Sequence, residues 1–204
     1  RALLDRLGLA APAVHVGLDQ LRDDLDARIA AAKIVGHRYI VCPYLTEEQR
    51  GSLDVYRQHA AFFNDVGRRV HEAGLRFAYH NHDFEFEPQN GTLPYDLLLE
   101  ETDPEHVDME LDLYWIVRGG QDPLAYFERY PGRFKLFHVK DMADRAGAQE
   151  MAPVGQGEID FGTILARARA QGGEHYFVEH DNAQDPLASI RQSYDHLSDL
   201  ALAS

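Results

Sequence analysis

The chain has 204 residues, 45% of them hydrophobic and 26% charged, with a formal net charge of −14 at pH 7. This length suits one domain with a sizeable core, so we expect a single domain over residues 1–204. No apolar run approaches the roughly 20 residues that span a bilayer, which argues against a membrane protein. The acidic charge and the scattered basic residues argue against nucleic-acid binding, because phosphate contacts dominate that affinity. A single cysteine, Cys42, excludes an internal disulfide and a cysteine-rich zinc site.

The opening residues are typical of an amphipathic helix and do not resemble a signal peptide. We therefore expect a cytoplasmic protein, or a periplasmic one if preceding sequence carries a signal. A small molecule is the expected binding partner, and homo-oligomerisation stays open.

Short apolar runs of strand length alternate with helical patterns along the whole chain. Strands are predicted at 13–17, 39–42, 76–86, 107–113, 134–140 and 176–181, with a weak one at 151–154. Helices are predicted at 18–34, 53–73, 95–101, from 122 onward, from about 160 to 171 and at 186–200. Continuous apolar strands separated by helices favour a parallel sheet that is covered by helices.

The third of these strands leads into a cluster of polar side chains: His80, His82, Asp83 and Glu85. Residues two apart in a strand share a side, so we expect His80 and His82 to point the same way. One histidine alone is more often a satisfied structural residue. Two histidines beside two carboxylates favour a functional site, with a metal as the simplest ligand.

Three later apolar strands also close on a residue able to bind a metal: Asp112, His138 and Glu179. Each has a simpler interpretation, since Asp112 is also suited to cap a helix and any of the three to form an ion pair. Burial of an unpaired carboxylate is costly, however, so a cation partner is expected for Glu179. Side chains that gather at the carboxyl ends of parallel strands are typical of a (β/α)₈ TIM barrel. Six firm strands and one weak strand leave such a barrel without its first strand, which is expected before residue 1. A doubly wound open sheet is the alternative fold.

Five segments in the same order resemble the xylose-isomerase-like TIM-barrel superfamily, and within it the sugar phosphate isomerase/epimerase group. They are residues 79–86, 110–115, 138–141, 154–160 and 177–180. The resemblance covers nearly the whole chain and is specific for fold. It is less specific for substrate, because the superfamily includes ketose 3-epimerases, inosose dehydratases, hydroxypyruvate isomerases, 3-dehydroshikimate dehydratases and apurinic endonucleases.

The resemblance implies one divalent metal ion held by Glu, Asp, His and Glu from four strands. The positions that match the last three ligands are Asp112, His138 and Glu179. The first Glu falls at Ala78, and Glu85 is the nearest carboxylate that replaces it, with His80 and His82 as competing ligands. Carboxylates with imidazole suit Mn²⁺, Mg²⁺, Co²⁺ or Zn²⁺, and ligand type does not choose among them.

The implied chemistry is proton abstraction next to a carbonyl of a sugar, keto-sugar or polyol, through an enediolate, in an isomerase or epimerase. Glu179 is the candidate base, and His80 or His82 is the complementary acid, because imidazole exchanges protons near neutral pH. If the acid protonates a β-hydroxyl instead, the same site acts as a dehydratase or lyase. The candidate substrate contacts are His15, Glu110, Trp115 and Lys140.

Simpler roles exist for these contacts. Glu110 is equally suited to a buried ion pair with Lys135 or Arg76, and Lys140 to a structural salt bridge. Trp115 stands where epimerases often carry a substrate-contacting histidine. Together with Ala78 this disfavours simple 3-epimerase chemistry but not a metal site. The ligand lost at Ala78 keeps open a non-catalytic sugar-binding or partner subunit. An apurinic-endonuclease-like phosphodiesterase is disfavoured by the acidic charge.

Overall fold

Strands and helices alternate along the chain, as the hydrophobic pattern predicts. The computed structural model describes residues 1–200. The chain forms two compact units, and the boundary between them falls within strand β4. The first unit consists of Arg1–Asn81 and Glu87–Glu110, and the second of His82–Phe86 and the chain from Leu111 onward. None of the helices in residues 1–200 combines the length and the apolar character needed to cross a membrane.

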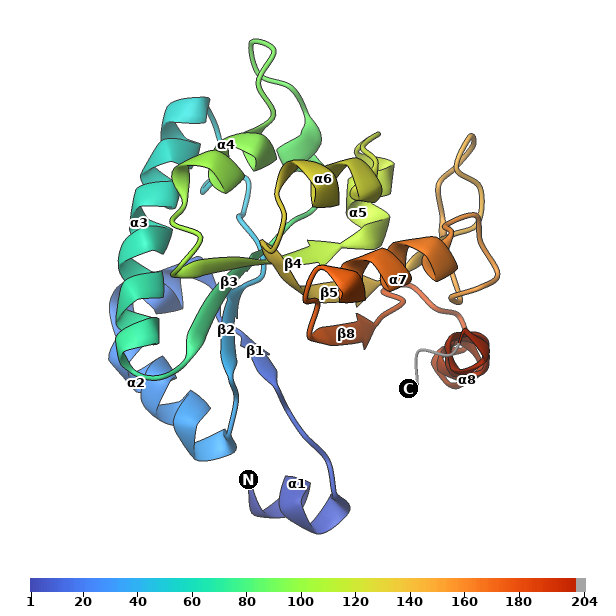
Figure 1. Cartoon of the computed structure of the whole chain (residues 1–204), viewed down its shortest axis with the longest axis horizontal. Helices are drawn as coiled ribbons and strands as arrows, with labels where there is room; N and C mark the ends of the chain where they lie inside the picture. Colours follow the sequence, from blue (N-terminus) through green and yellow to red (C-terminus); the bar gives the residue numbers. More distant parts are fainter. Residues whose placement is uncertain (201–204) are drawn as a thin grey trace. The chain divides into compact units, whose positions relative to one another are not determined.

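The first unit contains four parallel strands that are neighbours in chain order. They are β1 (Ala13–His15), β2 (Tyr39–Cys42), β3 (Arg76–His80) and β4 (Val107–Asp112). Its helices are α1 (Ala2–Leu7), α2 (Leu18–Val35), α3 (Leu53–Glu72) and α4 (Pro94–Glu101). Helices α2 and α3 run along one side of β2 and β3 (Figure 1). These strands and helices confirm the predicted elements to within two residues at most ends, the main exception being the end of β3.

The hydrophobic core of the first unit explains this arrangement. All four residues of β2 are fully buried, as expected for a parallel strand that is covered on both faces. Helix α3 presents a buried apolar stripe that includes Phe63, Val66 and Val70. A Cβ at Gly67 of the same helix would come within 2.5 Å of the His106 carbonyl oxygen, so glycine permits the close approach of α3 to the start of β4.

As far as residue 200, the second unit contains one parallel strand pair, one antiparallel pair and four helices. Its strands are β5 (Phe134–Val139), β6 (Asp141–Met142), β7 (Met151–Ala152) and β8 (His175–Val178). Its helices are α5 (Leu113–Arg118), α6 (Pro123–Arg129), α7 (Phe161–Ala170) and α8 (Pro186–Asp199), and η1 (Phe84–Phe86) is a short 3₁₀ turn. Strand β5 pairs with β8 in parallel. Each of the four helices begins at an aspartate whose carboxylate accepts backbone N–H groups of the first turn: Asp112, Asp122, Asp160 and Asp185.

The structure overturns one prediction about the histidine-rich segment. Strand β3 ends at His80, so His82 does not share a strand face with it. The chain turns because the Glu85 carboxylate accepts the backbone N–H of His82 at 2.8 Å and the Asp83 carbonyl accepts that of Phe86 at 2.9 Å. Local hydrogen bonds of this kind compete with strand continuation.

Two further predictions need correction in the second unit. Residue 113 was expected to end a strand, but it begins α5, which the hydrophobic pattern did not predict. The weak strand at 151–154 was counted among the barrel strands. It is β7, and it pairs antiparallel with β6 as part of a small ribbon.

Candidate metal centre

Three predicted metal ligands come together in the second unit: Asp112, His138 and Glu179. We call them the Asp112 cluster. Each offers one donor atom, and these atoms lie within 4.8 Å of one another. Asp112 ends β4, His138 lies one residue before the end of β5, and Glu179 directly follows β8. The Asp112 side chain is fully buried, that of His138 is 8% exposed and that of Glu179 is 45% exposed. A molecule from solvent would therefore approach the cluster from the Glu179 side.

Lys140 supplies positive charge to the cluster. Its Nζ lies 2.8 Å from Glu179 Oε2, 3.2 Å from Asp112 Oδ2 and 3.3 Å from Asp181 Oδ2. Burial on its own would lower the pKa of Lys140, but the carboxylates of Asp112 and Glu179 outweigh it and raise that pKa well above its usual range. Lys140 therefore stays protonated, and the predicted salt bridge exists.

Glu179 is held through one of its two carboxylate oxygens. His138 Nδ1 lies 2.8 Å from Oε2, the same atom that Lys140 contacts. The hydrogen bond with His138 is the main cause of a pKa of Glu179 well below its usual range, with burial opposing it and Lys140 adding to it. Within residues 1–200 the other oxygen, Oε1, has no hydrogen-bond partner. Glu179 is thus an ionised, oriented carboxylate with one oxygen available.

Asp112 has a structural role as well. Its Oδ1 accepts the backbone N–H groups of Tyr114 and Trp115, each at 3.0 Å, which caps α5. Both simpler interpretations of this residue, helix cap and ion-pair partner, are therefore correct. The cap does not compete with metal binding, because it uses Oδ1 and leaves Oδ2, the atom that Lys140 contacts.

Glu85 and His82 also belong to the second unit, but they lie apart from these donor atoms. Glu85 is fully buried and its Oε2 accepts the His82 backbone N–H. The His82 ring is stacked on Phe84, with centroids 5.7 Å apart, and lies 5.3 Å from the Trp115 ring. The structure does not gather Glu85 with the Asp112 cluster. Its assignment as the fourth ligand stays a prediction.

Three candidate residues meet in the first unit: His15, His80 and Glu110. Glu110 is fully buried, with its Oε2 2.7 Å from His15 Nε2 and 3.3 Å from His80 Nδ1. Arg76 forms a two-pronged ion pair with Asp108, at 2.5 and 2.8 Å, and its alternative pairing with Glu110 stays a prediction. Two imidazoles and a carboxylate are also a ligand set for a transition metal.

The donor set of the Asp112 cluster fits a divalent cation. Two carboxylates and an imidazole suit Mn²⁺, Mg²⁺, Co²⁺ or Zn²⁺. Burial of two carboxylates so close together demands a positive charge near them, which the Lys140 ammonium provides. A bound ion would compete with Lys140 for the carboxylate oxygens of Asp112 and Glu179.

Asp141 is a functional candidate that the sequence did not reveal. This fully buried carboxylate accepts backbone N–H groups from four residues: Met142, Gly155, Gly157 and Ile159, at 2.8–3.2 Å. A Cβ at Gly157 would lie 2.3 Å from Asp141 Oδ1, so the glycine is needed for this contact. Asp141 thereby fixes the loop that follows β5. The sequence contains both partners of this contact, Asp141 and the segment Gly155-Gln156-Gly157, but neither of them alone indicates that they touch.

The parallel strands with helices and the acidic cluster at strand ends define an α/β protein of the TIM-barrel type. The sequence matches the Xylose isomerase-like TIM barrel family over residues 5–200. The chain therefore belongs to this family, which confirms the predicted fold class and the resemblance.

The individual proteins that resemble this chain have low sequence identity to it. Inosose dehydratase from Lacticaseibacillus casei is 29% identical over 148 residues, which cover 65% of this chain and 49% of the relative. The chain thus spans about half the length of this curated relative. Two solved structures from Parabacteroides distasonis, each described as a sugar phosphate isomerase/epimerase, are 25% and 28% identical, with TM-scores of 0.80 and 0.79. They cover 97% and 96% of this chain, and the matches span 79% and 73% of their own chains.

Proposed function

We propose that this chain belongs to a divalent-metal-dependent isomerase or epimerase that removes a proton next to a carbonyl of a sugar, keto-sugar or polyol. The observation that carries the proposal is the convergence of Asp112, His138 and Glu179 in one acidic cluster that is open to solvent at Glu179. Membership of the family and the names of the two similar solved structures support it. A small-molecule carbohydrate is accordingly the proposed partner.

The proposed ligands are Asp112 through Oδ2, His138, and Glu179, with Glu85, His80 or His82 as a fourth. When bound, the divalent ion would supply Lewis-acid polarisation of the substrate carbonyl. Lys140 adds a fixed positive charge beside the same atoms, since its Nζ contacts both carboxylates. A buried ammonium in this position stabilises negative charge that develops on a substrate oxygen.

Glu179 is the proposed base. Its Oε2 is fixed by His138 and Lys140, which orients the carboxylate and leaves Oε1 toward an incoming molecule. Proton transfer from carbon to Oε1 gives an enediolate. His82, whose ring lies against Trp115, is the proposed acid in this unit, and His80 is the alternative. Return of a proton to the opposite face completes an epimerisation.

Dehydration is the second candidate reaction. It begins with the same proton removal and continues with loss of a β-hydroxyl to a general acid. The observation in its favour is the set of curated relatives named inosose dehydratase. His15 and Glu110, the remaining proposed substrate contacts, are compatible with either reaction.

The test is a metal-supplemented reaction in D₂O with a panel of ketoses, 3-keto sugars and 2-keto-myo-inositol. Deuterium in a product that is an isomer of the substrate supports the isomerase or epimerase. A product that has lost water supports the dehydratase. We expect Glu179→Gln to abolish either signal, and the control Glu48→Gln, which changes an exposed side-chain carboxylate, to retain it. Absence of exchange with every carbonyl compound would contradict the proposal and favour a non-catalytic sugar-binding subunit. Cleavage of abasic DNA instead would identify a phosphodiesterase.

A further inference from the structure

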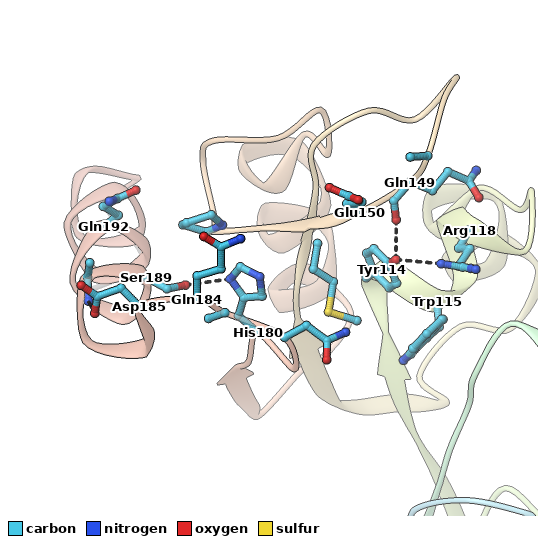
Figure 2. A pocket seen from close by; sticks show the side chains of 16 residues that line it. Tyr114, Trp115, Arg118, Gln149, Glu150, His180, Gln184, Asp185, Ser189 and Gln192 are labelled. Atoms are coloured by element: carbon cyan, nitrogen blue, oxygen red, sulfur yellow. Dashed lines mark hydrogen bonds between the residues drawn. The ribbon is translucent and has the colours of Figure 1, made fainter.

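A cavity of about 640 Å³ lies in the second unit (Figure 2). Helix α8 forms one wall, α5 forms another, and the loop around Gln149 closes the third side. Asp112, His138 and Glu179 are not part of its lining. Two lining residues nevertheless adjoin the cluster. Trp115 donates its backbone N–H to Asp112, and His180 directly follows Glu179.

Trp115 lines the cavity and also contacts the cluster through Asp112. Lys140 Nζ is 5.9 Å from the centroid of the Trp115 ring, and the Trp115 side chain lines the cavity. A molecule bound in the cavity would therefore lie beside the candidate metal ligands without occupying their positions. The cavity is large enough for a ligand of its own, since binding sites for small molecules span roughly 300–1,000 Å³.

The lining is rich in groups that bind hydroxyls. Its amide and carboxylate side chains are Gln149, Asn182, Gln184, Gln192, Glu150 and Asp185. Amides donate and accept hydrogen bonds, and carboxylates accept them, so together they match the paired donor and acceptor character of a hydroxyl. The rings of Tyr114 and Trp115 add apolar surface. Several polar groups beside aromatic rings are suited to a sugar or polyol rather than to an apolar molecule.

The charge balance of the lining disfavours an anion. Among the lining residues within 1–200, Arg118 carries the one guanidinium, and this group is already engaged: it lies 3.0 Å from Asp83 Oδ2 and 3.1 Å from the Tyr114 hydroxyl, and it contacts the Trp115 ring. Two carboxylates, Glu150 and Asp185, face the same space. A phosphate in the cavity would meet net negative charge, whereas a neutral hydroxyl-rich group would not.

The walls are fixed before any ligand binds. The Tyr114 hydroxyl donates to the Gln149 carbonyl oxygen at 2.5 Å, which ties the loop to α5. His180 Nδ1 lies 2.9 Å from Ser189 Oγ, which ties the segment after β8 to α8 (Figure 2). Asp141 holds the other end of the loop. Such preorganisation reduces the entropy cost of binding.

We propose that this cavity binds a neutral, hydroxyl-rich group, such as a second sugar ring, that is joined to the part of the substrate reacting at the metal centre. The inference rests on the proposed function for its link to a reaction, but sugar binding in the cavity is measurable without one. The expected substrates are therefore glycosides or extended polyols. Substrates that carry a phosphate on the part bound in the cavity are disfavoured.

The test is calorimetric titration of the metal-supplemented protein with glucose, maltose, cellobiose and glucose 6-phosphate. We expect at least one disaccharide to bind about tenfold more tightly than glucose, which corresponds to about 1.4 kcal/mol. Glucose 6-phosphate should bind no more tightly than glucose. The double variant Asn182→Ala/Gln184→Ala should remove most of the disaccharide advantage, because both exposed side chains line the cavity. The matched control is Gln58→Ala, an exposed amide on α3, which should keep it.

Three results would overturn the proposal. They are equal binding of glucose and both disaccharides, salt-sensitive preference for glucose 6-phosphate, or full disaccharide affinity in the double variant. Titration of the EDTA-treated Asp112→Asn variant separates this proposal from the proposed reaction. If disaccharide binding persists there while no substrate ever exchanges deuterium, the reaction is refuted and the cavity assignment stands. If exchange occurs but the disaccharide advantage is absent, the cavity assignment is refuted and the proposed reaction stands.

Discussion

Lys140 Nζ and His138 Nδ1 both lie 2.8 Å from the same atom, Oε2 of Glu179. One carboxylate oxygen is thus shared by an ammonium and an imidazole. Because Lys140 also contacts the fully buried Asp112, it neutralises charge that would otherwise be costly to bury. A divalent ion at the cluster would take over part of this role, so lysine and metal are expected to act on the same carboxylates.

Replacement of Lys140 by methionine should therefore destabilise the metal-free protein. Removal of one partner of a buried ion pair costs about 3–5 kcal/mol. Urea unfolding in EDTA measures the loss, and Mn²⁺ should restore more stability to Lys140→Met than to the unaltered protein. The exposed Lys33→Met control should change stability by no more than about 0.5 kcal/mol. Equal stability of Lys140→Met and the parent would show that the ammonium does not balance the carboxylates.

The Asp141 carboxylate should be needed for the loop that closes the cavity. In Asp141→Asn an NH₂ group replaces one oxygen and faces backbone N–H donors, so the variant loses hydrogen bonds to a charged acceptor, each worth about 1.5–3 kcal/mol. We expect a loss of about 2–3 kcal/mol in unfolding free energy. Hydrogen exchange at the amides of Gly155 and Gly157 should accelerate. Asp144→Asn, on the exposed part of the same loop, is the control, and unchanged exchange in Asp141→Asn would contradict the assignment.

His59 should make the protein less stable in mild acid. This buried imidazole lies 2.5 Å from the Gln49 carbonyl oxygen, and burial lowers its pKa, with a further contribution from Arg22 and opposition from the Gln49 hydrogen bond. The unfolded chain then binds a proton first as the pH falls below about 6.5, which favours unfolding by up to about 1.4 kcal/mol per pH unit. Stability is complete above that pH and is lost toward the lower folded pKa.

The measurement is urea unfolding at pH 7.5 and 5.5 for the parent and His59→Gln. The other titrating groups are common to both proteins, so the parent should lose more stability than the variant by up to about 1.4 kcal/mol. An identical pH dependence in both would mean that His59 does not contribute.

The sequence predicted most strands and helices because their apolar runs are continuous and their ends carry capping residues. Asp112, His138 and Glu179 were foreseen because each closes an apolar strand, and parallel strands bring such ends together. Their convergence depends on the parallel strand topology more than on local contacts, so the hydrophobic pattern was sufficient to predict it.

The segment after His80 was mispredicted for the opposite reason. Whether a strand continues there depends on one side chain, Glu85, accepting a backbone N–H three residues earlier, and hydrophobic periodicity carries no information about that bond. The short helix α5 escaped for a related reason, since its start depends on the Asp112 cap. Asp141 was missed because its partners Gly155 and Gly157 are 14 and 16 residues away.

Calorimetric titration of the EDTA-treated protein with Mn²⁺ measures whether the Asp112 cluster binds a divalent cation. We expect one tight site per chain. Asp112→Asn should weaken that site on the order of 100-fold, in line with the cost of disturbing metal-site residues. The exposed control Asp23→Asn should bind as the parent does. Absence of Mn²⁺ binding to the parent, or equal binding by Asp112→Asn, would mean that the Asp112 cluster is not a metal site.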